Sequence, residues 1–186
     1  SEMCIRDRAN HVGNIRYLCD IVNPDFGAIL KVGTAHAGEF GGVENIAITK
    51  SELADGVVPT GGVALNLDDP RVAAMEDKAT AEVTWFGVEG RHVRDIEAPV
   101  VRASEVRTDH SGCPQFRLTF PEGDSYEVAS KLIGEHHVYN LLAAATLAHA
   151  AGIPAGDIAR ALSELGAVSR YRMERTDRPD GVTVIN

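Results

Sequence analysis

A histidine and a lysine in one stretch, 28–53, are the residues whose types and spacing suggest chemistry most directly. His36 lies in a glycine-rich loop after the apolar run 28–32, and Lys50 lies in a segment with helical apolar spacing. Ligands of open α/β sheets bind beyond the carboxyl ends of the strands, where this loop begins. Taken singly, a loop histidine is more often hydrogen-bonded to backbone, and a helical lysine is usually a solvated charge. The stretch is a candidate site because its loop begins at the carboxyl end of a predicted strand.

The elements that must position these residues alternate between strands and helices. Three short apolar runs predict buried strands: 28–32, 63–65 and 81–86. Helical patterns between them argue for a parallel sheet. From residue 96 to 132 apolar and polar residues alternate, with hairpin signals at Ser111-Gly112 and Glu122-Gly123. We therefore predict an α/β fold, in which a mostly parallel sheet is flanked by helices and carries a small antiparallel layer.

Local signals add detail to this fold. Asp69 directly before Pro70 is a good helix N-cap, which gives the aspartates of N-L-D-D-P a structural role. The segment 13–21 predicts a short helix with four inward residues: Ile15, Leu18, Cys19 and Val22. His92 and His110 are isolated in the sequence, and we expect both at the surface.

Composition limits the class of function. A formal net charge of -9 and a pI near 5.2 argue against nucleic acid or an anionic membrane as a partner. The 3 cysteines lack metal-ligand spacing and indicate free thiols in a reducing compartment. No apolar run has the length of a membrane span. We expect a cytoplasmic, monomeric enzyme without membrane insertion.

The motifs G-T-A-H, G-E-F-G and K-S-E-L, in this order, resemble the central domain of the Mur ligases. Within that superfamily they are most similar to the ligases that add D-alanyl-D-alanine. Residues 1–8 do not match and are expected to be a non-family leader. The resemblance implies a partial ATP-binding central domain over 9–168, then a linker and the first strand of a truncated C-terminal domain over 169–186. The sequence contains no G-x-x-x-x-G-K-[ST], so we expect the phosphate-binding loop to be missing and the domain to be incomplete.

The resemblance also implies roles for individual residues. The lysine matching Lys50 is carbamylated by carbon dioxide and, together with His36, binds Mg²⁺, which prefers hard oxygen ligands. Asn140 in G-E-H-H-V-Y-N matches an asparagine whose amide reads the adenine edge, and Asn66 lies near the nucleotide. Arg172 matches an arginine that contacts the nucleotide. Without the resemblance, Asn140 would be part of an ordinary helix start and Arg172 a solvated linker residue.

For the parent enzyme the resemblance implies an ATP-dependent ligase of peptidoglycan precursor synthesis. ATP phosphorylates the terminal carboxylate of UDP-MurNAc-tripeptide, and the amine of D-Ala-D-Ala displaces phosphate from the acyl phosphate. The 186-residue chain alone is predicted to be inactive.

Two alternatives remain open. One is another member of the superfamily, such as the diaminopimelate- or lysine-adding ligase or folylpolyglutamate synthase. Those proteins typically carry an acidic residue before the histidine, where this chain has Ala35. The other alternative is a stand-alone domain without catalysis, which should fold cooperatively by itself. A fragment, by contrast, should expose apolar strand edges.

Overall fold

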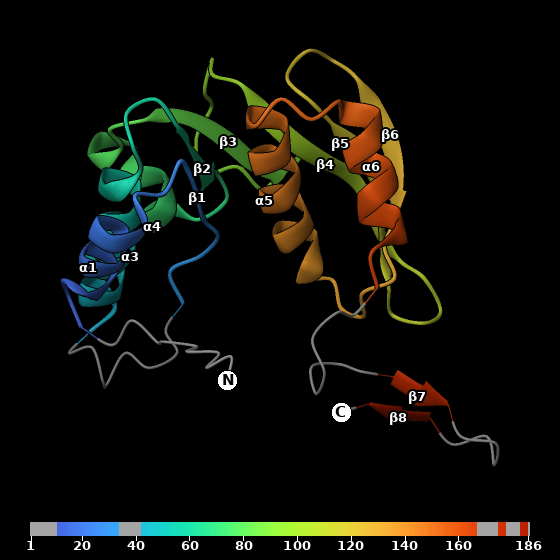
Figure 1. Ribbon diagram of the computed structural model, residues 1–186. Helices are drawn as coiled ribbons and strands as arrows, with labels where there is room; N and C mark the ends of the chain where they lie inside the picture. Colours follow the sequence, from blue (N-terminus) through green and yellow to red (C-terminus); the bar gives the residue numbers. More distant parts are fainter. Residues whose placement is uncertain (1–10, 34–41, 167–174, 178–182, 186) are drawn as a thin grey trace. The chain divides into compact units, whose positions relative to one another are not determined.

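The computed structural model describes residues 11–33, 42–166, 175–177 and 183–185. They belong to two compact units that divide after Val100, and Figure 1 labels the elements of each. Within the described ranges, no helix combines the length and the apolar character that crossing a bilayer requires.

The first unit contains a parallel sheet with helices packed on it, as the alternating pattern predicted. The strands are adjacent and parallel in chain order: β1 (Phe26–Ile29), β2 (Gly62–Asn66) and β3 (Glu82–Val88). The helices of this unit are α1 (Asn14–Val22), α3 (Val43–Gly56), α4 (Pro70–Ala73) and the 3-10 helix η1 (Ala74–Lys78). Helix α3 packs on β1, α4 packs on β2, and α1 packs on α3.

The core of this unit lies between the sheet and these helices. Every residue of β2 is buried, which explains why Val63, Ala64 and Leu65 are all apolar instead of alternating with polar residues. Leu65 from β2 and Trp85 from β3 are at most 1% exposed, and they share a core cluster with Val72 of α4 and Ile46 of α3. Trp85 is the single tryptophan of the chain, so its fluorescence reports on this unit.

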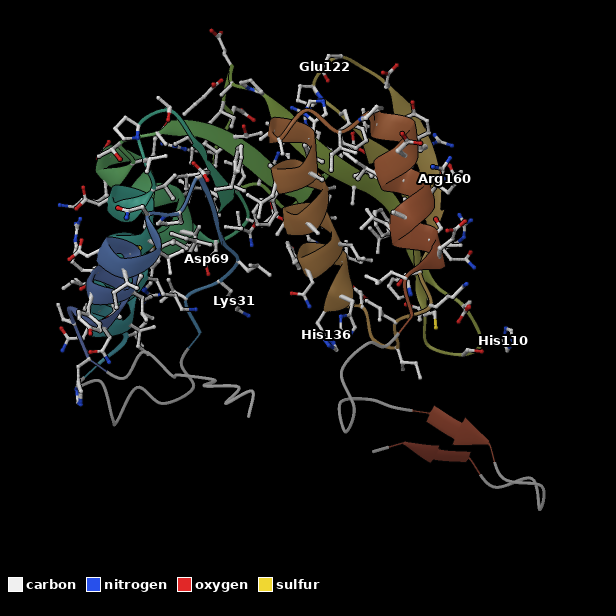
Figure 2. The ribbon with its side chains drawn as sticks, in the orientation of Figure 1. Lys31, Asp69, His110, Glu122, His136 and Arg160 are labelled. Carbon is white, nitrogen blue, oxygen red and sulfur yellow. The ribbon has the colours of Figure 1, made fainter. Side chains whose placement is uncertain are left out.

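The second unit contains the antiparallel layer that the hairpin signals predicted. Its strands pair in order: β4 (Val100–Thr108), β5 (Pro114–Thr119) and β6 (Ser125–Ala129). Gly112 and Gly123 occupy the two turns with φ of 82° and 98°, a conformation that favours glycine. Helix α5 (His137–Ala150) packs on β5 and on α6 (Ala155–Glu164), which also packs on β6. His110 is exposed, as predicted (Figure 2).

A separate pair of short strands follows in the sequence. Strand β7 (Arg175–Asp177) pairs antiparallel with β8 (Thr183–Ile185), and β8 falls where the sequence predicted a strand.

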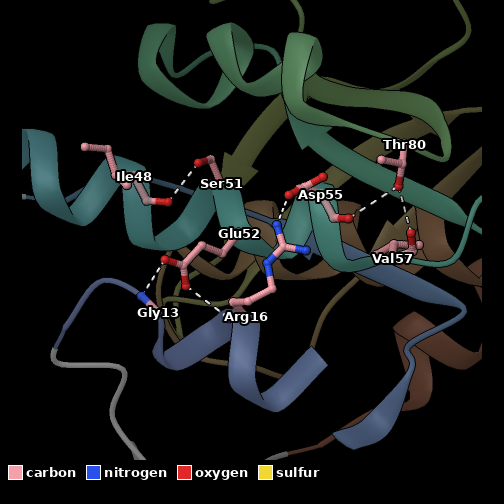
Figure 3. A network of polar contacts seen from close by, with 8 residues as sticks. All are labelled: Gly13, Arg16, Ile48, Ser51, Glu52, Asp55, Val57 and Thr80. Atoms are coloured by element: carbon pink, nitrogen blue, oxygen red, sulfur yellow. Dashed lines mark hydrogen bonds and ion pairs between the residues drawn. The ribbon is translucent and has the colours of Figure 1, made fainter. Parts of the chain in front are cut away.

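Helix α1 is held on α3 by polar contacts that cross between the two helices (Figure 3). Gly13 precedes α1 and provides no side-chain cap, but the Glu52 carboxylate of α3 accepts hydrogen bonds from Gly13 N at 2.6 Å and Arg16 N at 3.0 Å. The Arg16 guanidinium also forms an ion pair with Asp55. One α3 carboxylate therefore supplies the acceptors that the start of α1 lacks.

The close approach of α1 to α3 depends on Gly56. A Cβ atom at Gly56 would lie 2.6 Å from both Cβ and Sγ of Cys19, which is buried at 6% exposure. We expect Gly56→Ala to lower the free energy of unfolding by about 1–3 kcal/mol, because the helices must separate to admit the methyl group. Urea denaturation followed by Trp85 fluorescence measures this change. Ser51→Ala on the same helix is the matched control, and an equal effect of both variants would contradict the explanation.

One expectation for α1 was wrong. Cys19 is buried as predicted, but Leu18 and Val22, both expected to face inward, are 40% and 68% exposed. Among the described elements α1 packs chiefly on α3, so one side of its apolar surface stays open.

Candidate functional site

The segment that follows β1 is held by side chains from the next strand and helix. Asn66 Nδ2 donates to the Leu30 carbonyl at 2.7 Å, and Val32 N donates to the Asp69 carboxylate at 2.9 Å. The sequence predicted a strand over 28–32, but β1 ends earlier, at Ile29. The difference has a physical reason: these side chains bind the backbone groups that a longer strand would offer to its neighbours.

Lys50 reaches the same segment from α3. Its Nζ donates a hydrogen bond to the Lys31 carbonyl, and the side chain is half-buried. Burial lowers the pKa of Lys50 from its usual value, and the nearby Asp69 carboxylate opposes this shift. Figure 2 labels Lys31 and Asp69 at this place. The ammonium group is thus held against the backbone at the carboxyl end of β1.

A pocket of about 340 Å³ opens beside Lys50. Its walls are mostly apolar, and its lining residues are Ile15, Ala28, Ile29, Leu30, Lys31, Lys50 and Leu53.

The N-L-D-D-P segment ties the carboxyl ends of the parallel strands together. Asn66 is 4% exposed, and its Oδ1 accepts from Asp68 N at 2.9 Å while its amide nitrogen binds the end of β1. Asp68 in turn accepts from Val88 N at 2.8 Å, at the end of β3. Asp69 caps α4 by accepting from the backbone N of Arg71 and Val72, as predicted. This geometry supports a positioning role for Asn66, and its contact with a nucleotide stays a prediction.

His92 was expected at the surface, and this expectation was wrong. Its side chain is 19% exposed, and its Nε2 lies 3.9 Å from Asp68 Oδ1. Both groups lie over Gly87, where a Cβ would come within 2.6 Å of the carboxylate oxygen and 3.1 Å of the imidazole. Sequence reasoning missed this pair because the loop after β3 folds back across the end of β2. The glycine at position 87 is a local sign that side chains pack closely there.

Among the described residues of the second unit, Asn140 is the predicted site residue. Asn140 lies in the first turn of α5 and is exposed, with its Nδ2 3.2 Å from Nδ1 of His137. The rings of His136 and His137 lie with centroids 4.2 Å apart. Burial and the neighbouring His136 lower the pKa of His137. At neutral pH this favours a neutral imidazole that accepts from the Asn140 amide.

Two predicted site residues, His36 and Arg172, lie outside the described residues. Lys50 and Asn66 both bind the segment after β1, whereas Asn140 belongs to the other unit. Within the described part of the chain, no group of three His, Cys, Asp or Glu side chains is arranged to hold a metal ion.

Comparison with known proteins identifies the family to which this arrangement belongs. The Mur ligase middle domain matches residues 8–148, a range that includes Lys50, Asn66 and Asn140. The chain belongs to the Mur ligase family.

Individual relatives match this Mur ligase middle domain over nearly its whole length. The UDP-N-acetylmuramoyl-tripeptide–D-alanyl-D-alanine ligase of Mycobacterium tuberculosis is 43% identical over 178 residues, which is 96% of this chain and 33% of the relative. The crystal structure of MurF from Acinetobacter baumannii is similar with a TM-score of 0.79 and 32% identity, over 92% of this chain and 35% of that one. MurF from Thermotoga maritima in complex with ADP shares the fold, with a TM-score of 0.73 and 23% identity over 95% of this chain and 38% of that one.

The predicted resemblance is thereby confirmed. The chain spans about a third of the length of the curated relatives that it matches.

Proposed function

We propose that this middle domain serves an ATP-dependent ligase that adds D-Ala-D-Ala to UDP-MurNAc-tripeptide during peptidoglycan precursor synthesis. The observation that carries the proposal is the 43% identity to a ligase of that name over 96% of the chain. Residues 9–168 would form part of the ATP-binding domain, and 169–186 would lead into the next one. The A. baumannii similarity supports the same assignment.

The chemistry of Lys50 fits the carbamate that the family resemblance implies. Carbon dioxide reacts with a neutral amine, forming an N–C bond and releasing one proton, and the lowered pKa of Lys50 increases the neutral fraction. The pocket beside Lys50 has room for the added carboxylate group. Lys50 as a carbamate and His36 would hold Mg²⁺, which when bound supplies positive charge against the nucleotide phosphates.

The other residues of the site would orient the reacting groups. The Lys31 carbonyl holds the end of the Lys50 side chain, and Asn66 and Asp69 hold the segment that contains Lys31. In the second unit, Asn140 would offer one donor and one acceptor to the adenine edge. The T. maritima MurF was solved with ADP, which supports a nucleotide for this domain. Arg172 would bind the phosphate or ribose oxygens.

The pH dependence of carbamate formation should report the environment of Lys50. The neutral fraction rises as pH approaches the pKa, and the pKa of Lys50 lies below the usual 10.5. We therefore expect a carbamate signal in ¹³C NMR with ¹³C-bicarbonate at a pH below 10.5, the usual pKa of lysine. Lys50→Arg should remove that signal and Lys78→Arg should retain it. A low-pH signal that survives Lys50→Arg would contradict the prediction.

The proposed function is tested by two chimeric ligases. In one, this chain replaces the matched third of the M. tuberculosis ligase, and in the other it replaces the corresponding part of a diaminopimelate-adding ligase. We expect UDP-precursor-dependent phosphate release with the acceptor D-Ala-D-Ala in the first chimera and much weaker activity with diaminopimelate in the second. Equal activity in both would leave only the general ligase assignment. A folded but inactive first chimera would overturn the proposal. Ligation by the isolated 186-residue chain would contradict the separate prediction that this chain alone is inactive.

A further inference from the structure

The first turn of α5 holds the amide of Asn140 in one orientation. Asn140 lies three positions after His137, a spacing at which two side chains meet on the same helical face. Their contact joins Asn140 Nδ2 to His137 Nδ1 at 3.2 Å. An amide nitrogen only donates, so His137 Nδ1 is the unprotonated acceptor and the ring proton lies on Nε2. The hydrogen bond thus takes one N–H of the amide and leaves Oδ1 and the second N–H for other partners.

The imidazole of His137 is itself held in place by packing. Its ring centroid lies 4.2 Å from that of His136, with an angle of 38° between the ring planes. The His136 ring, labelled at the start of α5 in Figure 2, lies over Gly134. A Cβ at Gly134 would come within 2.5 Å of His136 Cε1 and 2.7 Å of its Nδ1. The acceptor for the Asn140 amide is therefore positioned before any ligand binds.

The surroundings of His137 keep this acceptor available at neutral pH. Burial and, to a smaller extent, the neighbouring His136 lower its pKa below the ordinary value of 6.5. A protonated imidazole carries N–H groups at both nitrogens, so its Nδ1 could no longer accept from an amide. The neutral form is the one that matches the observed contact.

The orientation of an asparagine amide decides which purine it binds. Adenine carries an exocyclic amino group that donates, whereas guanine carries a carbonyl in the same place that accepts. An amide whose oxygen faces this group binds adenine and repels guanine, and the flipped amide does the reverse. A free amide can take either orientation and discriminates poorly. A neighbour that holds one orientation therefore adds selectivity without touching the base.

We propose that His137 is a positioning residue that makes the nucleotide site select adenine over guanine, because it fixes the amide of Asn140 through Nδ2. The proposal rests on the proposed function, in which Asn140 reads the adenine edge. His137 accepts one amide N–H, and Asn140 presents Oδ1 and its other N–H to the base. The role of His137 is thus specificity, exerted through Asn140.

Two substitutions separate the acceptor from the ring. His137→Phe keeps an aromatic ring beside His136 but removes the acceptor, whereas His137→Asn supplies a side-chain oxygen that can accept the same N–H. The M. tuberculosis chimera defined above is titrated with ADP and with GDP by calorimetry in the presence of Mg²⁺. We expect His137→Phe to lower the ratio of ADP to GDP affinity about tenfold and His137→Asn to keep it within about twofold of the parent.

The affinity ratio distinguishes amide orientation from stability. A variant that only loosens the fold would weaken binding of both nucleotides alike and leave their ratio unchanged. His110→Phe is the matched control, since it makes the same exchange at an exposed histidine of the same unit. It should leave the ratio at the parental value.

Three results would overturn the proposal: equal binding of ADP and GDP by the parent chimera, a parental ratio in His137→Phe, or a loss of preference in His137→Asn as large as in His137→Phe. If the parent chimera releases phosphate with D-Ala-D-Ala, such results reject the role of His137 alone. A chimera without ligase activity in which His137→Phe lowers the ratio would support that role and count against the proposed function alone. A folded chimera that binds neither nucleotide would overturn both.

Discussion

Replacing Lys50 by arginine in the M. tuberculosis chimera is expected to slow D-Ala-D-Ala-dependent phosphate release by at least about a hundredfold. Arginine keeps the positive charge and can still donate to the Lys31 carbonyl, so the segment after β1 should stay in place. Its guanidinium remains protonated and does not form a carbamate, so the proposed anionic magnesium ligand would be missing. The initial rate at saturating substrates measures the effect.

The control for this prediction is Lys78→Arg, a change of the same type at an exposed position in η1. Trp85 fluorescence should match the parent in both variants, which separates lost chemistry from lost folding. A Lys50→Arg chimera with the parental rate would show that the proposed carbamate is not needed.

Replacing Asp69 by alanine is expected to lower the free energy of unfolding of the first unit by about 2–4 kcal/mol. One carboxylate oxygen accepts from Val32 N, and the other caps the start of α4. Alanine removes the cap and leaves the Val32 N–H without its acceptor in a buried position. Urea denaturation of the isolated chain, followed by Trp85 fluorescence, measures the change.

A graded variant makes this prediction more specific. Asparagine at position 69 retains one acceptor oxygen, so Asp69→Asn should lose only one of the two sets of hydrogen bonds. We therefore expect it to lower the free energy of unfolding by about half as much as Asp69→Ala. Asp95→Ala, at an exposed position in the same unit, should change stability by no more than about 0.5 kcal/mol. If Asp69→Asn destabilises as much as Asp69→Ala, the negative charge and not the number of acceptors is what matters.

The parts of the fold that local sequence determines were predicted well. The Asp69-Pro70 cap depends on two neighbouring residues, and the structure confirms it. The alternation of strands and helices predicted the parallel sheet, and the glycines at 112 and 123 marked the two hairpin turns. Each of these signals lies within a few residues of the feature that it specifies.

The errors concern contacts between distant segments. Strand β1 ends at Ile29 because Asn66, 36 positions after Leu30, takes the carbonyl that a longer strand would use. His92 is partly buried because the loop after β3 returns to Asp68. Helical spacing alone could not show that Val22 lacks a covering element among the described residues. At the candidate site, Lys50 and Asn66 bind the carbonyls of Lys31 and Leu30, two consecutive residues, and only the tertiary fold reveals that they share this segment.

The Glu52 contact with the start of α1 has a consequence for the order in which this unit folds. Helix α1 has 9 residues, and helices shorter than about 12 residues are marginal in isolation. Its first N–H groups are satisfied by a carboxylate that lies 39 and 36 positions away in the sequence. Helix α1 is therefore expected to form only after α3 has formed and to open before it. The formation of α1 would therefore depend on a helix that is already in place.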